Sequence, residues 1–530
     1  MSHKPLDYIR GELLRGAMSR REFMGRAALL GISAAAASNM LLSTSAKAAT
    51  PKSGGTLRVA AGTGGTTDTL DPVKFYSTND YQRAFATYSP LVGIDRQSKA
   101  APALAESWEP NADATQWTFN LRSGVTWSNG KDLTPQDVIY SLQRHLAEKS
   151  ESPAKPLLEQ VTEMKADGKH AVRMTLKSPN ADLPVLFSQP QFVITQDGVD
   201  GFDQAVSIGP FLIKEMQVGI RTVLERNPNY WGGPAHLDAI QLDVVTDSNS
   251  RMNALMAGKY DIAEAVDQKL LDLVKNAPGV ELVAAKSSQH TNLAMMCDRA
   301  PTDNNDLRLA MKYLIPRQGI VDNVFKGFGQ IGNDHQVSPT DPFYCSDIEQ
   351  RPYDVDKAKF HLKKAGMEGV TIDLHTSDQA VSNSEAIALL CKEGAKPAGL
   401  NYNVIVVPPG SYWTTAWMQQ PFVVSGWNAR PTADLMLTIA NKSGGGWNET
   451  QWGNERFDKL LVEARGELND AKRKEMYCEM QRMLHDDGGV GMIAYYDLID
   501  GRRSNVMGFE PHSAGMGRNP FFSTEVWLDA

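Results

Sequence analysis

The sequence has few cysteines and none of the common signatures of a catalytic or metal site. Its four cysteines lack the CxxC spacing of a zinc ribbon or a thioredoxin-like motif. HExxH and GxSxG are absent, and the ten histidines are scattered along the chain. We therefore expect no metal, no cofactor and no enzymatic activity. A catalytic carboxylate pair stays open as an alternative.

The cysteines themselves allow two interpretations. Free cysteines are commonly buried, which favours four isolated thiols. In an oxidising compartment one disulfide can form instead. The sequence does not choose among the possible pairings of its four cysteines, which are Cys297, Cys345, Cys391 and Cys478.

Positive charge is also scarce. The 530 residues include 54 Lys/Arg and 62 Asp/Glu, which gives a net charge of −8. Residues 1–48 hold seven of these cations and three of the anions, so the remainder carries −12. A chain this acidic argues against nucleic acid or an anionic membrane as its main partner. Its length exceeds one ordinary hydrophobic core, so two or more lobes are expected.

Long apolar runs are scarce; the one considered as a targeting segment is the uncharged, weakly apolar run near the N-terminus, from Ala27 to Ala46. The segment SRREFM at 19–24 resembles the twin-arginine export signal, and AKA at 46–48 offers the small residues that a signal peptidase reads. We predict a cleavable twin-arginine signal peptide over 1–48, with an uncleaved membrane anchor as the alternative. No cysteine lies near the run, which excludes a lipoprotein anchor. The mature protein is then expected to be soluble and periplasmic.

The most specific pattern runs from Ser207 to Val266. Gly209-Pro210 precedes one expected strand at 211–214, and an alternating strand at 220–224 completes a predicted hairpin. The turn-rich NPNYWGGP at 227–234 leads to a third strand at 240–244. A helix capped by Asp247 or Ser248 then ends at Gly258, before YDIA.

In this order and spacing, G-P-F, N-P-N-Y-W and G-x-Y-D-I resemble the extracytoplasmic solute-binding proteins of ABC importers, in the peptide- and nickel-binding family 5. Other segments resemble the same family. They are LDP at 70–72, WTFNLRSGVTW at 117–127, DLRLAMKYLI at 306–315 and YDVDKA at 353–358. In the third of these, Pro316 is expected to end the helix early.

This resemblance implies an α/β fold: a two-lobed periplasmic binding protein of type II (cluster C) with an extra satellite domain in the first lobe. Lobe I is expected from 49–90, 206–290 and 490–530. The satellite domain is expected over 91–205 and lobe II over 291–489. The tryptophans of the satellite domain are expected to lie in its core.

The resemblance also implies a function. It is that of a monomeric periplasmic component which captures a peptide or peptide-like solute between closing lobes and delivers it to an ABC permease and its ATPase. The alternatives are a receptor for a non-peptide carboxylated or cationic solute, such as an opine or amino-acid derivative, a secreted hydrolase, and a chaperone or sensor partner. Nickel and haem are disfavoured, because no histidine-rich segment is visible.

Ligand contacts are expected where an apolar strand ends in VVSGWNARPTAD, at 423–434. Peptide-binding members of the family often carry Asp three residues after this tryptophan, where it pairs with the ligand's α-ammonium. This chain has Arg430 there instead, and Asp434 lies at the seventh position. Arg430 is predicted to bind a carboxylate or phosphate, with a structural salt bridge or loop anchor as the alternative. Asp434 takes a cationic group or neutralises Arg430.

Aromatic and amide side chains complete the predicted site. Trp427 can stack on a ligand or face a cation, and Asn428 is its neighbour. Trp413, Trp417 and Trp447 are weaker candidates, because tryptophan is more often packed in a core. Tyr76, close to the LDP segment, is expected to approach the ligand from the first lobe.

Overall fold

The computed structural model describes residues 50–199, 201–202, 205–408, 410–510, 512–513 and 521–529. The predicted signal peptide and its cleavage site lie outside these residues. None of the helices in the described ranges combines the length and the hydropathy needed to cross a bilayer.

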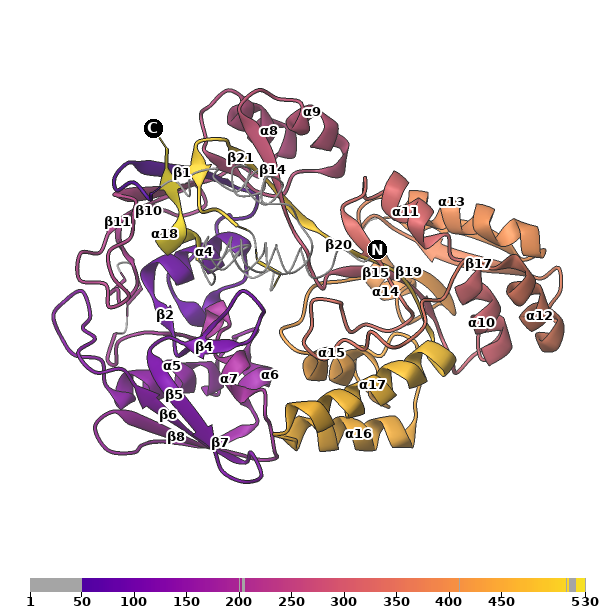
Figure 1. Cartoon of the computed structure of the whole chain (residues 1–530), viewed down its shortest axis with the longest axis horizontal. Coiled ribbons are helices and arrows are strands. Elements are labelled where there is room, and N and C mark those ends of the chain that lie inside the picture. The colour runs from indigo at the N-terminus through magenta and orange to yellow at the C-terminus, as the bar shows by residue number, and fades with distance from the viewer. Residues whose placement is uncertain are drawn as a thin grey trace, which may run out of the picture. The chain divides into compact units, whose positions relative to one another are not determined.

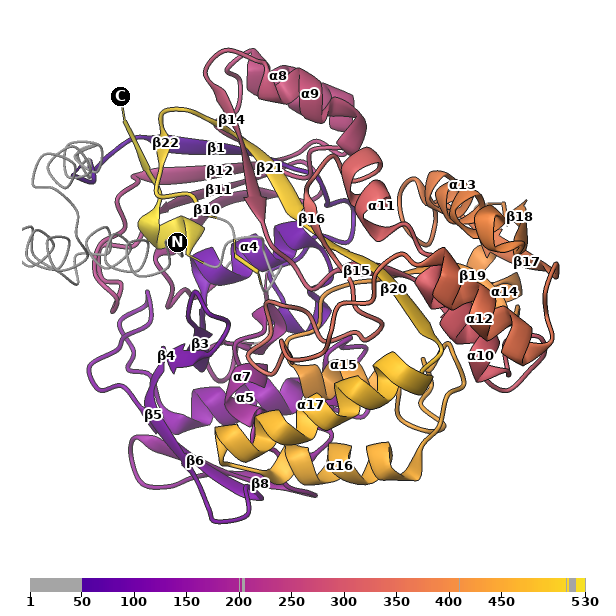
Figure 2. The ribbon, with the colours of Figure 1, turned by 45° about the vertical axis from the view of Figure 1, so that its right-hand side comes forward.

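A seven-stranded sheet contains the first strand of the described chain and most of the Ser207–Val266 pattern (Figure 2). The predicted hairpin is confirmed, and the predicted helix is α8 (Ser248–Met256), whose N-terminal amide groups Asp247 caps. The strand order is β10 (Phe211–Gln217), β11 (Arg221–Arg226), β12 (Ala239–Val244), β1 (Thr56–Ala61), β13 (Ile262–Ala263), β21 (Leu498–Arg503) and β14 (Val280–Ala285).

The hairpin turn requires glycine at one position. Gly219 has φ +71°, and a Cβ there would lie 2.9 Å from the carbonyl group of Gly65. A side chain at this position would therefore meet both backbone strain and a steric clash. The turn holds the hairpin against the glycine loop that follows β1.

A four-stranded antiparallel sheet with the order β5, β6, β8, β7 lies between β1 and β10 in the sequence. Trp117, Phe119 and Trp127 are buried in its core, as predicted. The strand alternation expected through Trp127 stops at Leu121, because the chain turns at Gly124. The elements are β5 (Ala105–Pro110), β6 (Gln116–Leu121), β8 (Ala171–Leu176), β7 (Val161–Ala166) and helix α5 (Pro135–Leu146), coloured purple in Figure 1.

A six-stranded sheet is formed by later parts of the chain. Its order is β16 (Gly329–Ile331), β20 (Val490–Tyr496), β15 (His290–Met295), β19 (Phe422–Trp427), β17 (Thr371–Thr376) and β18 (Asn401–Val406). Its core includes residues of α10 (Asn305–Tyr313), α11 (Arg317–Asn323), α12 (Val355–Ala365) and α13 (Ser384–Ala395). The early end of α10 before Pro316 is as predicted.

The chain passes between the seven- and six-stranded sheets at two neighbouring places. One connects β14 to β15 and the other connects β20 to β21. They lie side by side, since His290 pairs with Tyr495 and the Tyr496 N–H donates to the Gln289 carbonyl at 3.1 Å. Two adjacent crossing segments therefore join the two sheets.

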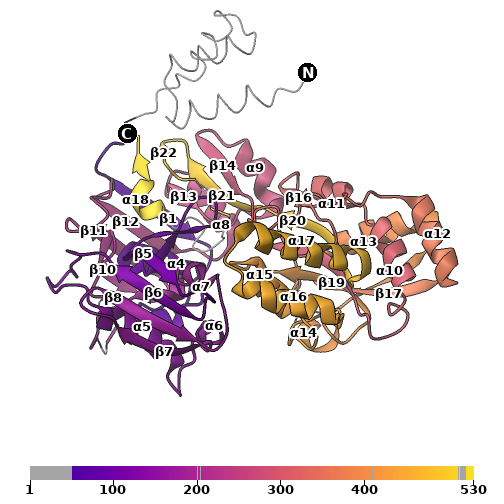
Figure 3. The same ribbon diagram turned by 60° about the horizontal axis from the view of Figure 1, so that its bottom comes forward.

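The long helix α17 (Asp470–Asp487) packs beside α16 (Glu455–Gly466), as Figure 3 shows. The predicted apolar stripe of α16 is buried. A disulfide joins Cys478 of α17 to Cys345, whereas Cys297 and Cys391 are free thiols. Of the two interpretations of the cysteines, the structure has the one with a single disulfide.

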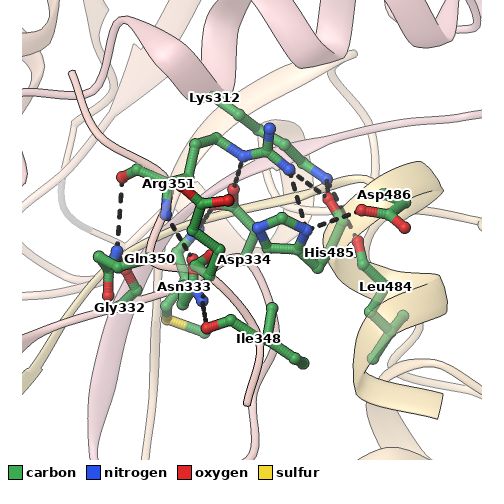
Figure 4. A network of polar contacts seen from close by, with 12 residues as sticks. Lys312, Gly332, Asn333, Asp334, Ile348, Gln350, Arg351, Leu484, His485 and Asp486 are labelled. Carbon is green, nitrogen blue, oxygen red and sulfur yellow. Dashed lines mark hydrogen bonds and ion pairs between the residues drawn. The ribbon is translucent and has the colours of Figure 1, made fainter. Parts of the chain in front are cut away.

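A buried charge network anchors the loop between β16 and α12 (Figure 4). Asp334 is fully buried and accepts hydrogen bonds from Arg317 and Arg351, each at 2.6 Å. Burial by itself would raise the pKa of Asp334, but the charges of Arg317, Lys312 and Arg351 outweigh it and lower this pKa to about 2. Lys312 donates to the last carbonyls of α17, and burial lowers its pKa to about 8. These contacts bind α10, α11, α17 and the loop into one unit.

Candidate functional site

The predicted ligand-binding segment begins where β19 ends. Its Gly426 touches a neighbouring loop so closely that an added Cβ would lie 2.4 Å from the Ala380 carbonyl oxygen. Trp427, the last residue of β19, is buried, stacks beside His290 and packs on Met436. Asn428 follows and is exposed. The end of β19 therefore places the packed ring of Trp427 and the exposed amide of Asn428 at the site.

A buried carboxylate holds this ring from behind. Glu449 is 1% exposed and accepts hydrogen bonds from four donors. Its Oε1 accepts from Trp427 Nε1 and Asn292 Nδ2, each at 2.9 Å. Its Oε2 accepts from Trp417 Nε1 and Ser425 Oγ, each at 2.6 Å. Because donors reach both oxygens, Glu449 fixes the orientation of two indoles at once.

Sequence reasoning missed Glu449. It lies in a loop after the glycine run at 444–446, two residues beyond Trp447. Acidic residues in such loops are usually exposed, so only its place beside a tryptophan set it apart. Its role depends on partners from β15, β19 and the segment around Trp417.

The tryptophans that Glu449 orients line an apolar cavity of about 310 Å³. Trp413 and Trp417 meet edge to face, with ring centroids 5.4 Å apart. Trp427 and Trp447 meet in the same way at 6.1 Å. The cavity is lined by Trp413, Trp417, Gly426, Trp427, Asn428, Arg430 and Trp447. The structure thus brings together the predicted tryptophans, Asn428 and Arg430 in what we call the tryptophan cavity.

Arg430 borders this cavity and has no carboxylate partner among the described residues. Its Nη1 donates to the backbone carbonyls of Asn428 and Ala429, at 3.2 and 3.1 Å. Its Cζ lies 5.8 Å from the ring centroid of Trp427 and 5.7 Å from that of Trp447. Within the described ranges no Asp or Glu lies at ion-pair distance from it, and burial lowers the pKa of its guanidinium. A positive charge is thus held half-buried against two rings by its own loop.

Asp434 lies apart from these residues. It belongs to the first turn of α15 (Ala433–Ala440), and its carboxylate accepts from Arg465 Nε at 3.1 and 3.0 Å. Burial raises the pKa of Asp434, and the charge of Arg465 opposes this shift. Asp434 therefore pairs with Arg465. The sequence had suggested Arg430 as its partner. The signal for this pairing was not available locally, because Arg465 lies on α16.

A second, polar cavity of about 330 Å³ also borders Arg430. Tyr76, 81% exposed, borders it just before α4 (Thr78–Thr87), which Ser77 and Asp80 cap. Gln191 donates to the Tyr81 hydroxyl at 3.0 Å. The lining of this glutamine cavity is Tyr76, Thr78, Tyr81, Gln189, Pro190, Gln191, Gln289, Asn428, Ala429 and Arg430. Tyr76 and Arg430 thus share one cavity, whereas the glutamines and Tyr81 were missed by sequence reasoning.

Arg430 also borders a third cavity of about 40 Å³, which Asp341 lines as well. Burial raises the pKa of Asp341 to about 6. In the part of the chain that the structure describes, no group of three His, Cys, Asp or Glu side chains is placed to hold a metal ion.

Comparison with known proteins gives one family. Residues 99–449 match the family model described as bacterial extracellular solute-binding proteins, family 5 Middle. The dipeptide-binding protein of Escherichia coli (strain K12) is 24% identical over 491 residues, covering 84% of this chain and 90% of that protein. Heme-binding protein A of Haemophilus influenzae is 27% identical over 436 residues, covering 75% of this chain and 80% of that protein.

Solved structures agree on the fold. HbpA2 from Haemophilus parasuis superposes with a TM-score of 0.81 at 19% identity, over 90% of this chain and all of that chain. DppA from Helicobacter pylori, in complex with the peptide STSA, gives 0.70 at 22% identity, over 90% of this chain and 99% of that chain. The predicted α/β fold of a periplasmic binding protein is therefore confirmed. With a family model that matches most of its length, this chain belongs to family 5 of the bacterial extracellular solute-binding proteins.

Proposed function

We propose that the protein is the periplasmic substrate-binding component of an ABC importer and that it captures a peptide or peptide-like solute. The observation that carries this proposal is the pair of cavities that meet at Arg430. One is apolar and lined by tryptophans, and the other is polar and lined by amides and hydroxyls. Such a mixture suits a solute with an amide backbone and side chains. The dipeptide-binding relatives support the same class of ligand.

Capture would occur by closure of two lobes. In this proposal, lobe I comprises 49–90, 206–290 and 490–530, the satellite domain 91–205, and lobe II 291–489. The glutamine cavity takes its lining from all three parts. The two crossing segments beside Gln289 and Tyr496 would serve as the hinge, because the chain passes between the seven- and six-stranded sheets there. The closed, monomeric form would then dock on the permease and its ATPase.

Export would use the twin-arginine machinery. The SRREFM segment and the AKA site support this route and processing after Ala48. Mass spectrometry of protein purified from the periplasm tests it directly. A mature N-terminus at Thr50 or later, or retention of the leader, would contradict processing after Ala48.

The function itself is tested by calorimetry and thermal unfolding with di- and tripeptides. A ligand at 100 times its Kd stabilises the folded state by about 2.7 kcal/mol. The expected result is saturable stabilisation while the peptide is recovered intact. Release of free amino acids would instead favour a secreted hydrolase.

A second candidate ligand is a carboxylated amino-acid derivative that is not a peptide. The charge of Arg430, which has no carboxylate partner among the described residues, favours it, since guanidinium groups bind carboxylates in a bidentate fork. Binding of an opine or an acylated amino acid, with no response to peptides, would select this candidate.

A further inference from the structure

The charges around the tryptophan cavity and the glutamine cavity are unbalanced. Among the described residues that line the tryptophan cavity and the glutamine cavity, Arg430 is the one with a formal charge. Asp341 and Arg430 both line the 40 Å³ cavity, but Asp341 lines neither the tryptophan cavity nor the glutamine cavity. A ligand that fills the tryptophan cavity and the glutamine cavity therefore meets, among their described lining residues, one positive charge and no negative one.

The guanidinium of Arg430 is prepared for an anion. Its Nη1 is held by two carbonyls of its own loop, and no hydrogen bond of Nε or Nη2 is found among the described residues. The ring faces of Trp427 and Trp447 keep water from part of the group. A half-buried charge without a counter-ion is unfavourable, and a bound carboxylate would compensate it.

The buried acid that orients the tryptophans cannot serve a ligand's ammonium group. Glu449 lies behind Trp417 and Trp427, and its two oxygens already accept four hydrogen bonds. At 1% exposure it offers no surface to a solute. Its contribution is to hold the two indoles that line the apolar side of the site.

We propose that the protein holds peptides by their C-terminal end: the α-carboxylate pairs with Arg430, and a large apolar C-terminal side chain fills the tryptophan cavity. The rest of the peptide then runs along the glutamine cavity, where neutral donors and acceptors suit amide groups. This inference rests on the proposed function. Family members with Asp at this position bind the α-ammonium at the N-terminal end of the peptide. In this chain, Arg430 would instead bind the carboxylate at the C-terminal end.

Calorimetry with four peptides tests the orientation on the whole mature chain. They are Gly-Gly-Phe, its N-acetyl form, its C-terminal amide and Gly-Gly-Ala. We expect N-acetylation to leave the affinity within a few-fold and amidation to lower it about 10- to 100-fold, the effect of one charge-assisted pair. Gly-Gly-Ala should bind at least 10-fold more weakly than Gly-Gly-Phe, because its methyl group leaves the tryptophan cavity unfilled.

Substitution of Arg430 supplies the decisive comparison. Its side chain hydrogen-bonds only its own loop among the described residues, so Arg430→Gln and Arg430→Asp should fold. Arg430→Gln should remove the difference between the free acid and the amide. Arg430→Asp should reverse the preference, so that the amide binds more tightly than the acid. Trp447→Ala, at a residue that is 51% exposed, should reduce the preference for Phe over Ala and keep the preference for the free carboxylate.

Each outcome separates this inference from the proposed function. If N-acetylation abolishes binding and amidation does not, C-terminal capture is wrong and peptide binding stands. An unchanged ratio of acid to amide in Arg430→Gln would also overturn it. If none of the four peptides binds, both C-terminal capture and peptide binding are overturned, and a non-peptide solute remains as the candidate.

Discussion

Replacement of Glu449 by glutamine tests whether this carboxylate organises the tryptophan cavity. The amide has one oxygen where the carboxylate has two, so the four donors cannot all keep an acceptor. If the amide oxygen takes the Oε1 position, Trp417 loses its acceptor, although the Ser425 hydroxyl can rotate and accept from the amide. If it takes the Oε2 position, Trp427 loses its acceptor, although a flipped Asn292 amide can adapt.

Either orientation leaves one indole N–H unpaired. An unsatisfied buried donor costs about 1–3 kcal/mol. The remaining bonds also lose their charge-assisted character, which adds about 1 kcal/mol. We therefore expect Glu449→Gln to lower the free energy of unfolding by about 2–4 kcal/mol.

Urea unfolding monitored by tryptophan fluorescence measures this change, and the emission of the folded variant should differ from that of the native protein. The matched control is Glu463→Gln, the same substitution at a half-exposed helix position where Lys459 is 3.8 Å away. The control should change stability by less than about 0.5 kcal/mol. If Glu449→Gln behaves like its control, the carboxylate does not hold the indoles and the reasoning is refuted.

Three further substitutions test the contacts that surround the site. Asp334→Asn should destabilise the protein by about 3–5 kcal/mol at pH 7, because two arginines lose their buried counter-ion. The pKa of Asp334 is depressed from 3.8 to about 2, so its contribution to stability is present above pH 3.8 and disappears as the pH falls through about 2. The urea midpoints of the native protein and Asp334→Asn should therefore converge between pH 7 and pH 2. A constant difference between the two midpoints would contradict this. Cys345→Ser should lower the free energy of unfolding by about 2–5 kcal/mol, because it removes the disulfide to Cys478. In thermal unfolding, a reductant should lower the melting temperature of the native protein and leave that of the variant unchanged. Asp434→Asn should destabilise by about 1–3 kcal/mol through Arg465 and leave peptide affinity unchanged in calorimetry; a large loss of affinity would return Asp434 to the binding site.

The sequence alone determined the local elements and the family. Alternating apolar residues, capping residues and glycines gave the hairpin at β10 and β11, helix α8 and the buried stripe of α16. These signals are local, because a strand or helix shows its periodicity and its ends within a few residues. The ordered motifs around Asn227–Trp231 then indicated family 5. One local pattern misled: the alternation after Leu121 continues past a turn at Gly124 and still points into the same core.

Only the tertiary structure decided which residues meet. Cys345 pairs with Cys478 across 133 positions, Asp434 turns to Arg465, and Glu449 gathers donors from three separate segments. Tyr76, just before α4, and Arg430, in the loop after β19, line one cavity although they lie far apart in the sequence. The physical reason is that charges, thiols and indoles act at contact distance in space, whereas the sequence records only neighbours along the chain. The sequence thus predicted Arg430 as a ligand contact, and the structure decided that it faces the two cavities without a carboxylate partner among the described residues.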